Sequence, residues 1–370
     1  MVVGRRMGRV MPAVALLLVV GCSPAADEPA DESGNDEPPA TDGPAEDPTQ
    51  EEAPAARWVS PDGDDDADGS SERPWATLEH AFAQLEPGDT LTVAGGTYRE
   101  RIRDPDLRTG RPDAPIRVVA DGSEPAVLEG LLWLRDLDHW SLEGLNVTWD
   151  EERNDSSEHM VKLSGGEGWQ LVDAEISGAR SFAGILIAES PSDWRLADLC
   201  VHSTHETNGT NQDHLIYVNS KADAGSGVIE RSLLFGAPNG SGVKLGGPRE
   251  YSEGTHRTTV RDNTIVETAQ PILIAWESSN NVLEGNLLGD AGDNYATIRG
   301  YRLEGEGNVA RGNAGYGATG LLLNDEGYRG IEEGDGNRYP VEPDFDRRDR
   351  CDGYVPQDEE ARDYGHVAER

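Results

Sequence analysis

The chain contains three lysines, and two of them stand at equivalent places in short segments that have the pattern of β-strands. In these segments apolar residues alternate with other residues, as they do in strands whose apolar side chains face a core. The residues between the apolar pairs therefore share one outward face. In sequence order, this column reads Lys162, Leu186, Tyr217, Lys244, Leu273, Arg299 and Leu322.

Cations in one column are exceptional here, because 32 Lys plus Arg against 70 Asp plus Glu give the chain a net charge of −38. A lysine near an arginine has its charged form disfavoured, which suits a general base. Strands one step apart are about 4.8 Å from each other, so Tyr217, Lys244 and Arg299 are expected within about 10 Å. The alternative is that Lys162 and Lys244 are ordinary solvated residues.

A second group of polar residues precedes the strand that contains Tyr217. It holds three of the eight histidines, His202, His205 and His214, together with Asp213. His-x-x-His in a loop lacks the helical geometry of a zinc-protease motif. The group is consistent with a polar rim of a binding groove, a metal site or an ordinary loop.

An acidic motif near residue 65 has the spacing that begins a calcium-binding loop. Asp64, Asp66 and Asp68 alternate and are followed by Gly69, but the twelfth position is Trp75 where a complete site has Glu. A partial Ca²⁺ contact and a solvated acidic turn both fit this pattern.

The elements that position these residues are short and repeated. Strand-like segments recur about every 28 residues between Trp140 and Asn308, and a second strand lies in each interval. With 44 Gly, 36% hydrophobic residues and almost no helical periodicity, the economical arrangement is a parallel β-solenoid with one repeat per turn.

Asparagines occupy the same position in three successive repeats, at Asn263, Asn286 and Asn313. Equivalent amides on stacked turns can donate to and accept from one another, so we expect a buried amide ladder. The alternative is that asparagine is common in turns.

The segment before the repeats contains the best helical pattern in the chain, Ala76–Leu85, with apolar residues on one face. Its surrounding motifs resemble the N-terminal cap of the pectate-lyase-like right-handed parallel β-helix superfamily. The motifs are Trp58–Pro61, Pro74–Thr77, Pro87–Thr90 and Gly95–Tyr98. The resemblance predicts an all-β fold, a right-handed parallel β-helix over residues 57–325 with an N-terminal capping helix.

The resemblance also implies a chemistry. Polysaccharide lyases of this superfamily remove the proton next to a uronate carboxylate with Lys or Arg, often with Ca²⁺ nearby. We therefore predict an anionic polysaccharide as partner, with Lys244 as base, Arg299 neutralising the carboxylate, and Tyr217 or His214 as proton donor. Substrate-binding residues are predicted at Lys162, Trp276, Tyr301, His205 and Asp213. A non-catalytic carbohydrate-binding or adhesion module and a structural surface protein remain the alternatives.

Both ends of the chain differ from the repeats. Three arginines precede a short apolar run, and the run ends in Val19–Cys22, which resembles a bacterial lipobox. We predict a lipoprotein signal peptide at 1–21 and a lipid anchor at Cys22. The protein is then expected in the cell envelope, at the outer membrane or extracellular.

Two acidic segments flank the repeats. Residues 23–55 hold eleven Asp or Glu and no Lys or Arg, so residues 22–56 are predicted to form a disordered Pro-rich linker. Residues 326–370 are predicted as an acidic tail. Cys200 and Cys351 are consistent with one disulfide or two free thiols. A monomer is expected, and the negative charge argues against nucleic acid as a partner.

Overall fold

The computed structural model describes residues 55–204, 213–250, 252–292 and 294–367. The signal peptide, the anchor at Cys22, most of the linker and His205 lie outside the described residues. Within the described ranges, no helix is long and apolar enough to cross a membrane.

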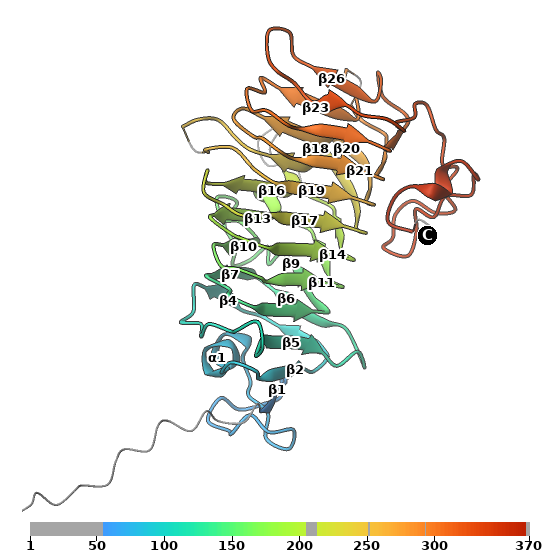
Figure 1. Ribbon diagram of the computed structural model, residues 1–370. Helices are drawn as coiled ribbons and strands as arrows, with labels where there is room; N and C mark the ends of the chain where they lie inside the picture. Colours follow the sequence, from blue (N-terminus) through green and yellow to red (C-terminus); the bar gives the residue numbers. More distant parts are fainter. Residues whose placement is uncertain (1–54, 205–212, 251, 293, 368–370) are drawn as a thin grey trace, which may run out of the picture. The chain divides into compact units, whose positions relative to one another are not determined.

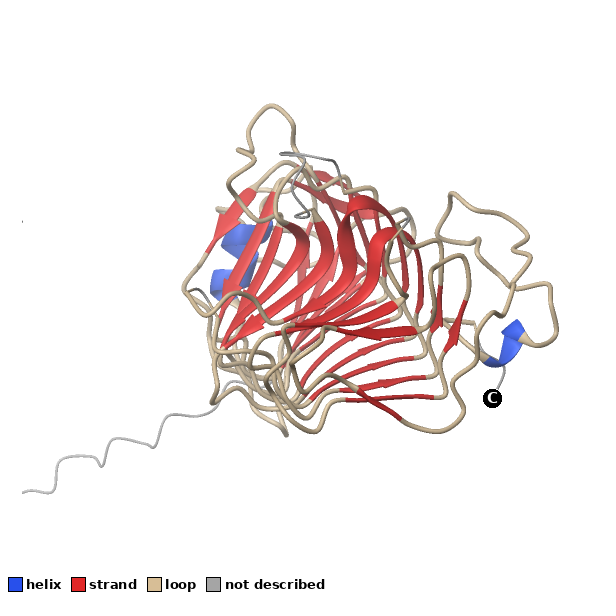
Figure 2. Cartoon of the chain, turned by 90° about the horizontal axis from the view of Figure 1, so that it is seen from above, coloured by secondary structure: helices blue, strands red, loops and turns tan. Residues whose placement is uncertain are grey.

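The strands stack in parallel on three faces around one apolar interior (Figures 1 and 2). Over the described residues the first face is an eleven-stranded sheet. Its strands, in stacking order, are β1 (Ala56–Val59), β2 (Thr90–Val93), β5 (Ile116–Ala120), β8 (Trp140–Glu143), β11 (Gln170–Val172), β14 (Trp194–Ala197), β17 (Gly227–Glu230), β19 (Thr258–Arg261), β21 (Val282–Glu284), β24 (Val309–Arg311) and β27 (Glu332–Glu333).

The second face begins at the corner where each turn leaves the first. Its strands are β3 (Gly96–Tyr98), β6 (Ala126–Glu129), β9 (Leu145–Thr148), β12 (Glu175–Ser177), β15 (Cys200–His202), β18 (Leu233–Leu245), β20 (Thr264–Ala275), β22 (Leu287–Leu288) and β25 (Ala314–Gly315). Strands β18 and β20 are long enough to continue around the next corner, so their C-terminal halves belong to the third face.

The third face carries the column of outward residues. Besides the two long strands it contains β4 (Arg101–Arg103), β7 (Leu131–Arg135), β10 (Val161–Ser164), β13 (Ala183–Glu189), β16 (His214–Ser220), β23 (Ile298–Tyr301) and β26 (Leu322–Asn324). The fold is thus a parallel β-solenoid, as the repeats predict.

The expected register is confirmed along most of the third face. The pairs along this face are Lys162 with Leu186, Leu186 with Tyr217, Tyr217 with Lys244, Lys244 with Leu273, and Leu273 with Arg299. The apolar residues that flank each column position are fully buried, because successive side chains of a strand point to opposite faces. The expected last member of the column, Leu322, is wrong by one residue.

Arg299 pairs with Leu323, and Leu322 pairs with Ile298. The three leucines 321–323 at the start of β26 have no alternation, so the pattern alone does not fix the register of this strand.

The amide ladder is confirmed, and it is longer than expected. The Asn263 side chain donates to Asn286 at 3.1 Å, Asn286 donates to Asn313 at 2.9 Å, and Asn313 donates to Asn337 at 3.2 Å. Each asparagine side chain also donates to a backbone carbonyl of the preceding turn. A second amide pair joins the side chains of Asn281 and Asn308 at 2.9 Å.

Helix α1 (Leu78–Gln84) lies beside the first strands and is shorter than the predicted Ala76–Leu85 (Figure 1). Its N-cap is Thr77, whose hydroxyl accepts a hydrogen bond from the backbone N–H of His80 at 3.2 Å. Leu78, Ala81 and Phe82 are buried in the main apolar core, where the rings of Phe82 and Trp140 lie 6.0 Å apart.

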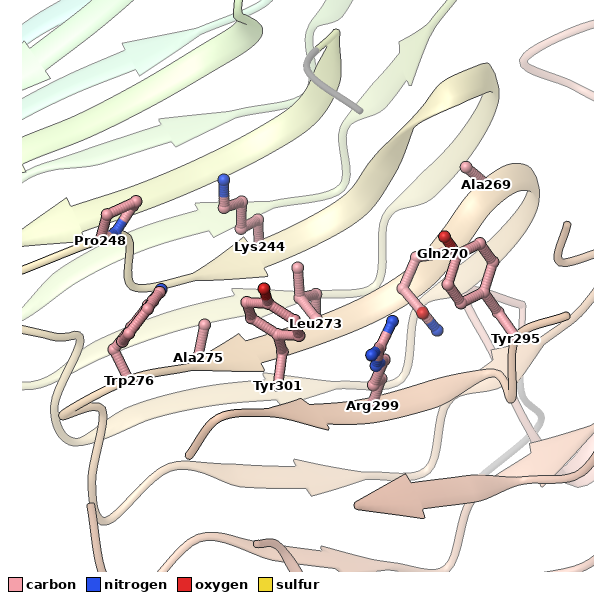
Figure 3. Close-up of a pocket in the computed structure, with 10 residues that line it drawn as sticks. All are labelled: Lys244, Pro248, Ala269, Gln270, Leu273, Ala275, Trp276, Tyr295, Arg299 and Tyr301. Atoms are coloured by element: carbon pink, nitrogen blue, oxygen red, sulfur yellow. The ribbon is translucent and has the colours of Figure 1, made fainter. Parts of the chain in front are cut away.

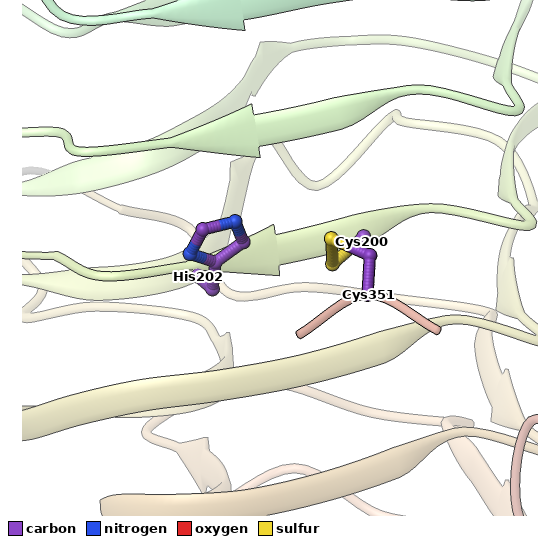
Figure 4. Close-up of side chains that lie close together, drawn as sticks. All are labelled: Cys200, His202 and Cys351. Carbon is purple, nitrogen blue, oxygen red and sulfur yellow. A yellow bond between two sulfur atoms is a disulfide. The ribbon is translucent and has the colours of Figure 1, made fainter. Parts of the chain in front are cut away.

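The C-terminal segment is more ordered than a free tail. Strand β27 and Asn337 continue the stack beyond the predicted boundary at residue 325. Cys351 forms a disulfide with Cys200, across 151 residues of sequence (Figure 4). Tyr354 packs on Phe235 of the second face with ring centroids 4.9 Å apart. A 3₁₀ turn, η1 (Ala361–Asp363), follows.

Candidate functional site

A cavity of about 390 Å³ lies over the third face, beside strands β18, β20 and β23 (Figure 3). Lys244, Arg299, Trp276 and Tyr301, four of the predicted site residues, line it. The remaining lining residues are Pro248, Ala269, Gln270, Leu273, Ala275 and Tyr295. Among the described residues, the lining contains two basic side chains and no carboxylate.

The register of three strands positions the two cations. Lys244 on β18 pairs with Leu273 on β20, which pairs with Arg299 on β23. The two Cα atoms are therefore two strand steps apart, about 10 Å. Leu273 lies between them in Figure 3 and separates the positive charges with an apolar side chain.

Lys244 lacks a carboxylate partner among the described residues. Its Nζ lies 3.2 Å from Nε2 of His214 and 4.6 Å from the centre of the Tyr217 ring. Burial lowers the pKa of Lys244 to about 8, because the ammonium form loses its hydration without gaining an anion. About one tenth of this lysine is then a free amine at pH 7, and about half at pH 8.

Tyr217 lies beneath the lysine and is partly exposed, although it is not among the residues that line the cavity. Its ring is held edge-on to His214, with centroids 5.6 Å apart. A Cβ at Gly247 would come 2.1 Å from the Tyr217 hydroxyl, so only glycine leaves room for the ring there. Burial raises the pKa of Tyr217 to about 12, which keeps the phenol protonated.

His214 does not lie where a proton donor to a substrate would have to be. It is fully buried and is absent from the cavity lining. Both ring nitrogens face protein atoms, because Nδ1 accepts from the backbone N–H of Ser241 at 2.8 Å and Nε2 faces Lys244. The expectation that His214 serves the leaving oxygen is therefore wrong.

Arg299 forms one ion pair and keeps a further donor. Its guanidinium contacts Asp325 at 3.0 Å and lies over the rings of Tyr301 and Tyr295. Its Nε is buried and has no partner among the described residues. Oε1 of Gln270, another buried atom of the cavity lining, also lacks one in this part of the chain. Two unsatisfied polar atoms in one cavity favour a polar ligand.

Two aromatic rings form one wall of the cavity. The centroids of Trp276 and Tyr301 are 6.0 Å apart, and the rings are nearly perpendicular. Trp276 directly follows β20 with a φ of 59°, a conformation that non-glycine residues adopt mainly under constraint. The ring lines the cavity and does not close the core.

Other predicted residues lie away from this cavity. Lys162 is three strand steps from Lys244, about 14 Å, beside the Trp133 ring. Asp213 is fully buried, and its carboxylate accepts from the side chain of Asn239 at 3.2 Å. Neither residue lines the cavity. A role for Asp213 in direct substrate contact is not consistent with its burial.

The acidic motif does not converge on a cation. Asp64 accepts from the backbone N–H of Asp66, while Asp68 accepts from Ser70 and forms an ion pair with Arg73. Throughout the described ranges, three potential metal-ligating atoms approach within 4.8 Å only at Cys200, His202 and Cys351, where the two sulfurs are joined to each other. The three aspartates therefore do not fit a Ca²⁺ site.

Sequence reasoning missed Gln270, Tyr295 and Asp325. Tyr295 lies in the loop before β23, and Gln270 lies within the long strand β20. One signal was available for Gln270, since this amide stands two residues before the apolar run Ile272–Ala275. Loop residues such as Tyr295 have no period that would place them.

Comparisons with known proteins agree with this architecture. No known family profile matches the chain. Pectate lyase PEL9 of Emericella nidulans is 26% identical over 119 residues, which are 32% of this chain and 27% of that protein. The chain thus matches about a quarter of the length of this curated relative.

Solved structures extend the likeness to most of the described repeats. The structure of XylC in complex with xylose gives a TM-score of 0.53 at 10% identity, over 77% of this chain and 70% of that one. A glycoside hydrolase gives 0.54 at 9% identity, over 76% and 95%. The fold is a pectate-lyase-like parallel β-helix. At these identities the structural likeness concerns the fold alone.

Proposed function

We propose that the cavity binds a uronate-containing polysaccharide and cleaves it by β-elimination. The observation that carries this proposal is Lys244, a partly buried lysine with a lowered pKa, two strand steps from Arg299 and without a carboxylate partner among the described residues. Perturbed titratable groups in a cavity are typical of functional sites. The partial match to a pectate lyase supports the same reaction class.

The residues divide the reaction between them. The Lys244 amine takes the C5 proton of the uronate, whose carboxylate is neutralised by Arg299. The electron pair forms the C4–C5 double bond as the C4–O bond breaks. The departing oxygen takes the proton of the Tyr217 hydroxyl, and the Lys244 ammonium then returns a proton to the tyrosinate through water. The products are a new sugar end and an unsaturated uronate.

The electrostatics of the cavity agree with an anionic ligand. The chain as a whole has a charge of −38, yet Lys244 and Arg299 are the charged residues of the lining. A carboxylated sugar would pair with the Arg299 donors, including the Nε that has no partner among the described residues. Gln270 supplies an acceptor for a sugar hydroxyl.

The first test is turnover by the full chain. Pectate, alginate and glycosaminoglycans would be incubated with the protein, and the unsaturated uronate would be followed by its ultraviolet absorbance. We expect absorbance to grow with at least one of these polymers. Tight binding without any unsaturated product would contradict the proposed cleavage.

A second candidate is non-catalytic carbohydrate binding, which the aromatic wall favours. Trp276 and Tyr301 present rings of the kind that pack on sugar faces. This role predicts binding of uncharged oligosaccharides as well. Isothermal titration calorimetry with charged and neutral oligosaccharides of equal length separates the two candidates. The proposed lyase should bind the charged ligands more tightly, because Lys244 and Arg299 attract the carboxylate. The non-catalytic role predicts similar affinities for both.

We extend the proposal to the placement of the protein. The lipobox-like Val19–Cys22 supports acylation of Cys22 and a position in the cell envelope, at the outer membrane or extracellular. Cys22→Ala should release the protein from membranes in detergent partitioning. Unchanged partitioning would contradict the anchor.

Two finer features of the fold are part of the same proposal. We expect the solenoid to coil in the right-handed sense and α1 to act as its cap. The buried face of α1 supports the second point, since Leu78, Ala81 and Phe82 all join the main core. A variant with Leu78→Asp and Phe82→Asp should expose the first strands and aggregate. A variant that stays monomeric would contradict the capping role.

A further inference from the structure

The hydrogen bonds around Lys244 have a fixed direction, and the direction starts at the backbone. The N–H of Ser241 lies 2.8 Å from Nδ1 of His214. A backbone N–H can only donate. Nδ1 therefore accepts and has no proton of its own, which fixes one side of the imidazole ring.

The other side of the ring follows from proton count. A neutral imidazole has one proton, so it must sit on Nε2. Nε2 lies 3.2 Å from Nζ of Lys244. Because Nε2–H can only donate, Nζ must accept, and an ammonium group has no lone pair with which to accept.

A charged imidazole does not fit this arrangement. It would place a proton on Nδ1 against the N–H of Ser241, and it would face a second cation across Nε2. Burial, with a further contribution from Lys244, lowers the pKa of His214 well below its usual value. The neutral ring with the proton on Nε2 is the form consistent with both contacts.

We infer that His214 is a positioning residue that stabilises the free-amine form of Lys244 through a donated Nε2–H hydrogen bond. In the free-amine form the lone pair of Nζ points at His214. Rotation about the Cε–Nζ bond turns the lone pair into the cavity when a substrate arrives. The catalytic meaning of this contact rests on the proposed function, whereas the direction of the hydrogen bond does not.

Other groups around Lys244 leave this assignment undisturbed. Strand β16 contributes the Tyr217 ring, and β20 contributes the uncharged Leu273. The positive charge on β23 belongs to Arg299, which is two strand steps away. The neighbouring Asp213 carboxylate accepts from Asn239.

The first experiment reads the ring directly and needs no change at the site. Full-length protein labelled with ¹⁵N-histidine would be studied by long-range ¹H–¹⁵N correlation, with His214 assigned by its absence in His214→Asn. We expect an unprotonated Nδ1 and a protonated Nε2 at neutral pH. A proton on Nδ1, alone or with Nε2, would overturn the inference.

The second experiment measures what the ring does to the lysine. Replacing Lys162 and Lys221 by Arg leaves Lys244 as the sole lysine, so ¹⁵N-lysine labelling gives one Nζ signal to titrate. We expect a midpoint near 8. His214→Asn keeps a hydrogen-bonding group near Ser241 but removes the donor to Lys244, and it should raise the midpoint by about one pH unit, a tenfold change in free amine below the midpoint.

An unchanged midpoint in His214→Asn would overturn the inference, and His214→Phe repeats the measurement with a ring of similar size. Both readouts are taken without substrate. If His214 has the expected tautomer but the protein cleaves no uronate polymer, the proposed function is refuted and the inference about His214 is not. Turnover by a protein whose Lys244 titrates at the same pH with and without His214 would refute the inference alone.

Discussion

Lys244 and Glu230 lie on the same turn of the solenoid, the partly buried Lys244 on the third face and the buried Glu230 on the first. Glu230 accepts from three arginines, with Arg195 and Arg231 each at 2.7 Å and Arg261 at 2.5 Å. Lys244 has an imidazole and a phenol ring for neighbours and no anionic partner in the part of the chain that the structure describes.

Burial acts on both groups in the same sense, toward the uncharged form, and the partners decide the outcome. Burial alone would raise the pKa of Glu230, but hydrogen bonds from the three arginines outweigh it and lower the pKa to about 2. Burial of Lys244 is uncompensated and lowers its pKa to about 8. The first arrangement keeps a buried charge, and the second makes the free amine more accessible, as the proposed reaction requires of a base.

The largest expected effect is at the uncompensated group. Lys244→Ala should reduce the rate of unsaturated-uronate formation about a hundredfold or more while changing polysaccharide affinity only a few fold. Lys221→Ala is the matched control, because Lys221 is exposed and pairs with Glu189 away from the cavity. If Lys244→Ala retains its turnover, the contrast between Lys244 and Glu230 is contradicted.

The complementary change is at the compensated group. Glu230→Gln should lower the free energy of unfolding by about 2 kcal/mol at neutral pH, a value discounted from the usual cost of breaking a buried pair because the arginines are partly exposed. Turnover should be unchanged. Glu284→Gln, which removes a more exposed ion pair with Arg311, should cost less than about 1 kcal/mol by urea denaturation. Equal losses in the two variants would contradict the special role of Glu230.

The two groups also separate the pH dependence of stability from that of activity. A lowered carboxyl pKa stabilises the fold above the unfolded-state value of 4.5, and this stabilisation is lost as pH falls toward about 2. The rate should instead rise about tenfold per pH unit up to about 8, where Lys244 loses its proton, and then level off. Rates measured at pH values between about 4.5 and 8 test the predicted pH dependence of the rate, and a rate that does not change over this range would contradict it.

The smallest effect is expected at the other lysine of the column. Lys162 is about 14 Å from Lys244 along the stack, so Lys162→Ala should weaken binding only a few fold and only for oligosaccharides long enough to span both residues. Titration with a series of chain lengths measures this. If Lys162→Ala weakens the binding of the shortest oligosaccharides as much as that of long ones, Lys162 contacts the ligand within the cavity, and this prediction is contradicted.

The column shows how far period-two alternation reaches. It predicts Tyr217, Lys244 and Arg299 in register because each is flanked by apolar residues that must be buried together. It fails at Leu322, where three leucines follow one another, and it says nothing of how deep a position lies. His214 and Asp213 are polar residues of a loop and strand start, and the sequence does not distinguish a buried from an exposed placement for them.

The remainder of the site depends on contacts that have no sequence period. Asp325 reaches Arg299 from 26 residues away, and Tyr295 comes from a loop. The direction of the hydrogen bond between His214 and Lys244 depends on the backbone of Ser241, which sequence patterns do not describe. Composition and spacing therefore predict the scaffold and the two cations, whereas the protonation of the base requires atomic positions.

The asparagine ladder has a consequence for how this scaffold can change. Its successive members are 23, 27 and 24 residues apart, yet their amides remain in contact. Differences in turn length are thus absorbed at the other corners, including the loops that border the cavity. Loops there can gain or lose residues without moving Lys244 relative to Arg299, so new substrate preferences can evolve by insertion while the two cations keep their spacing.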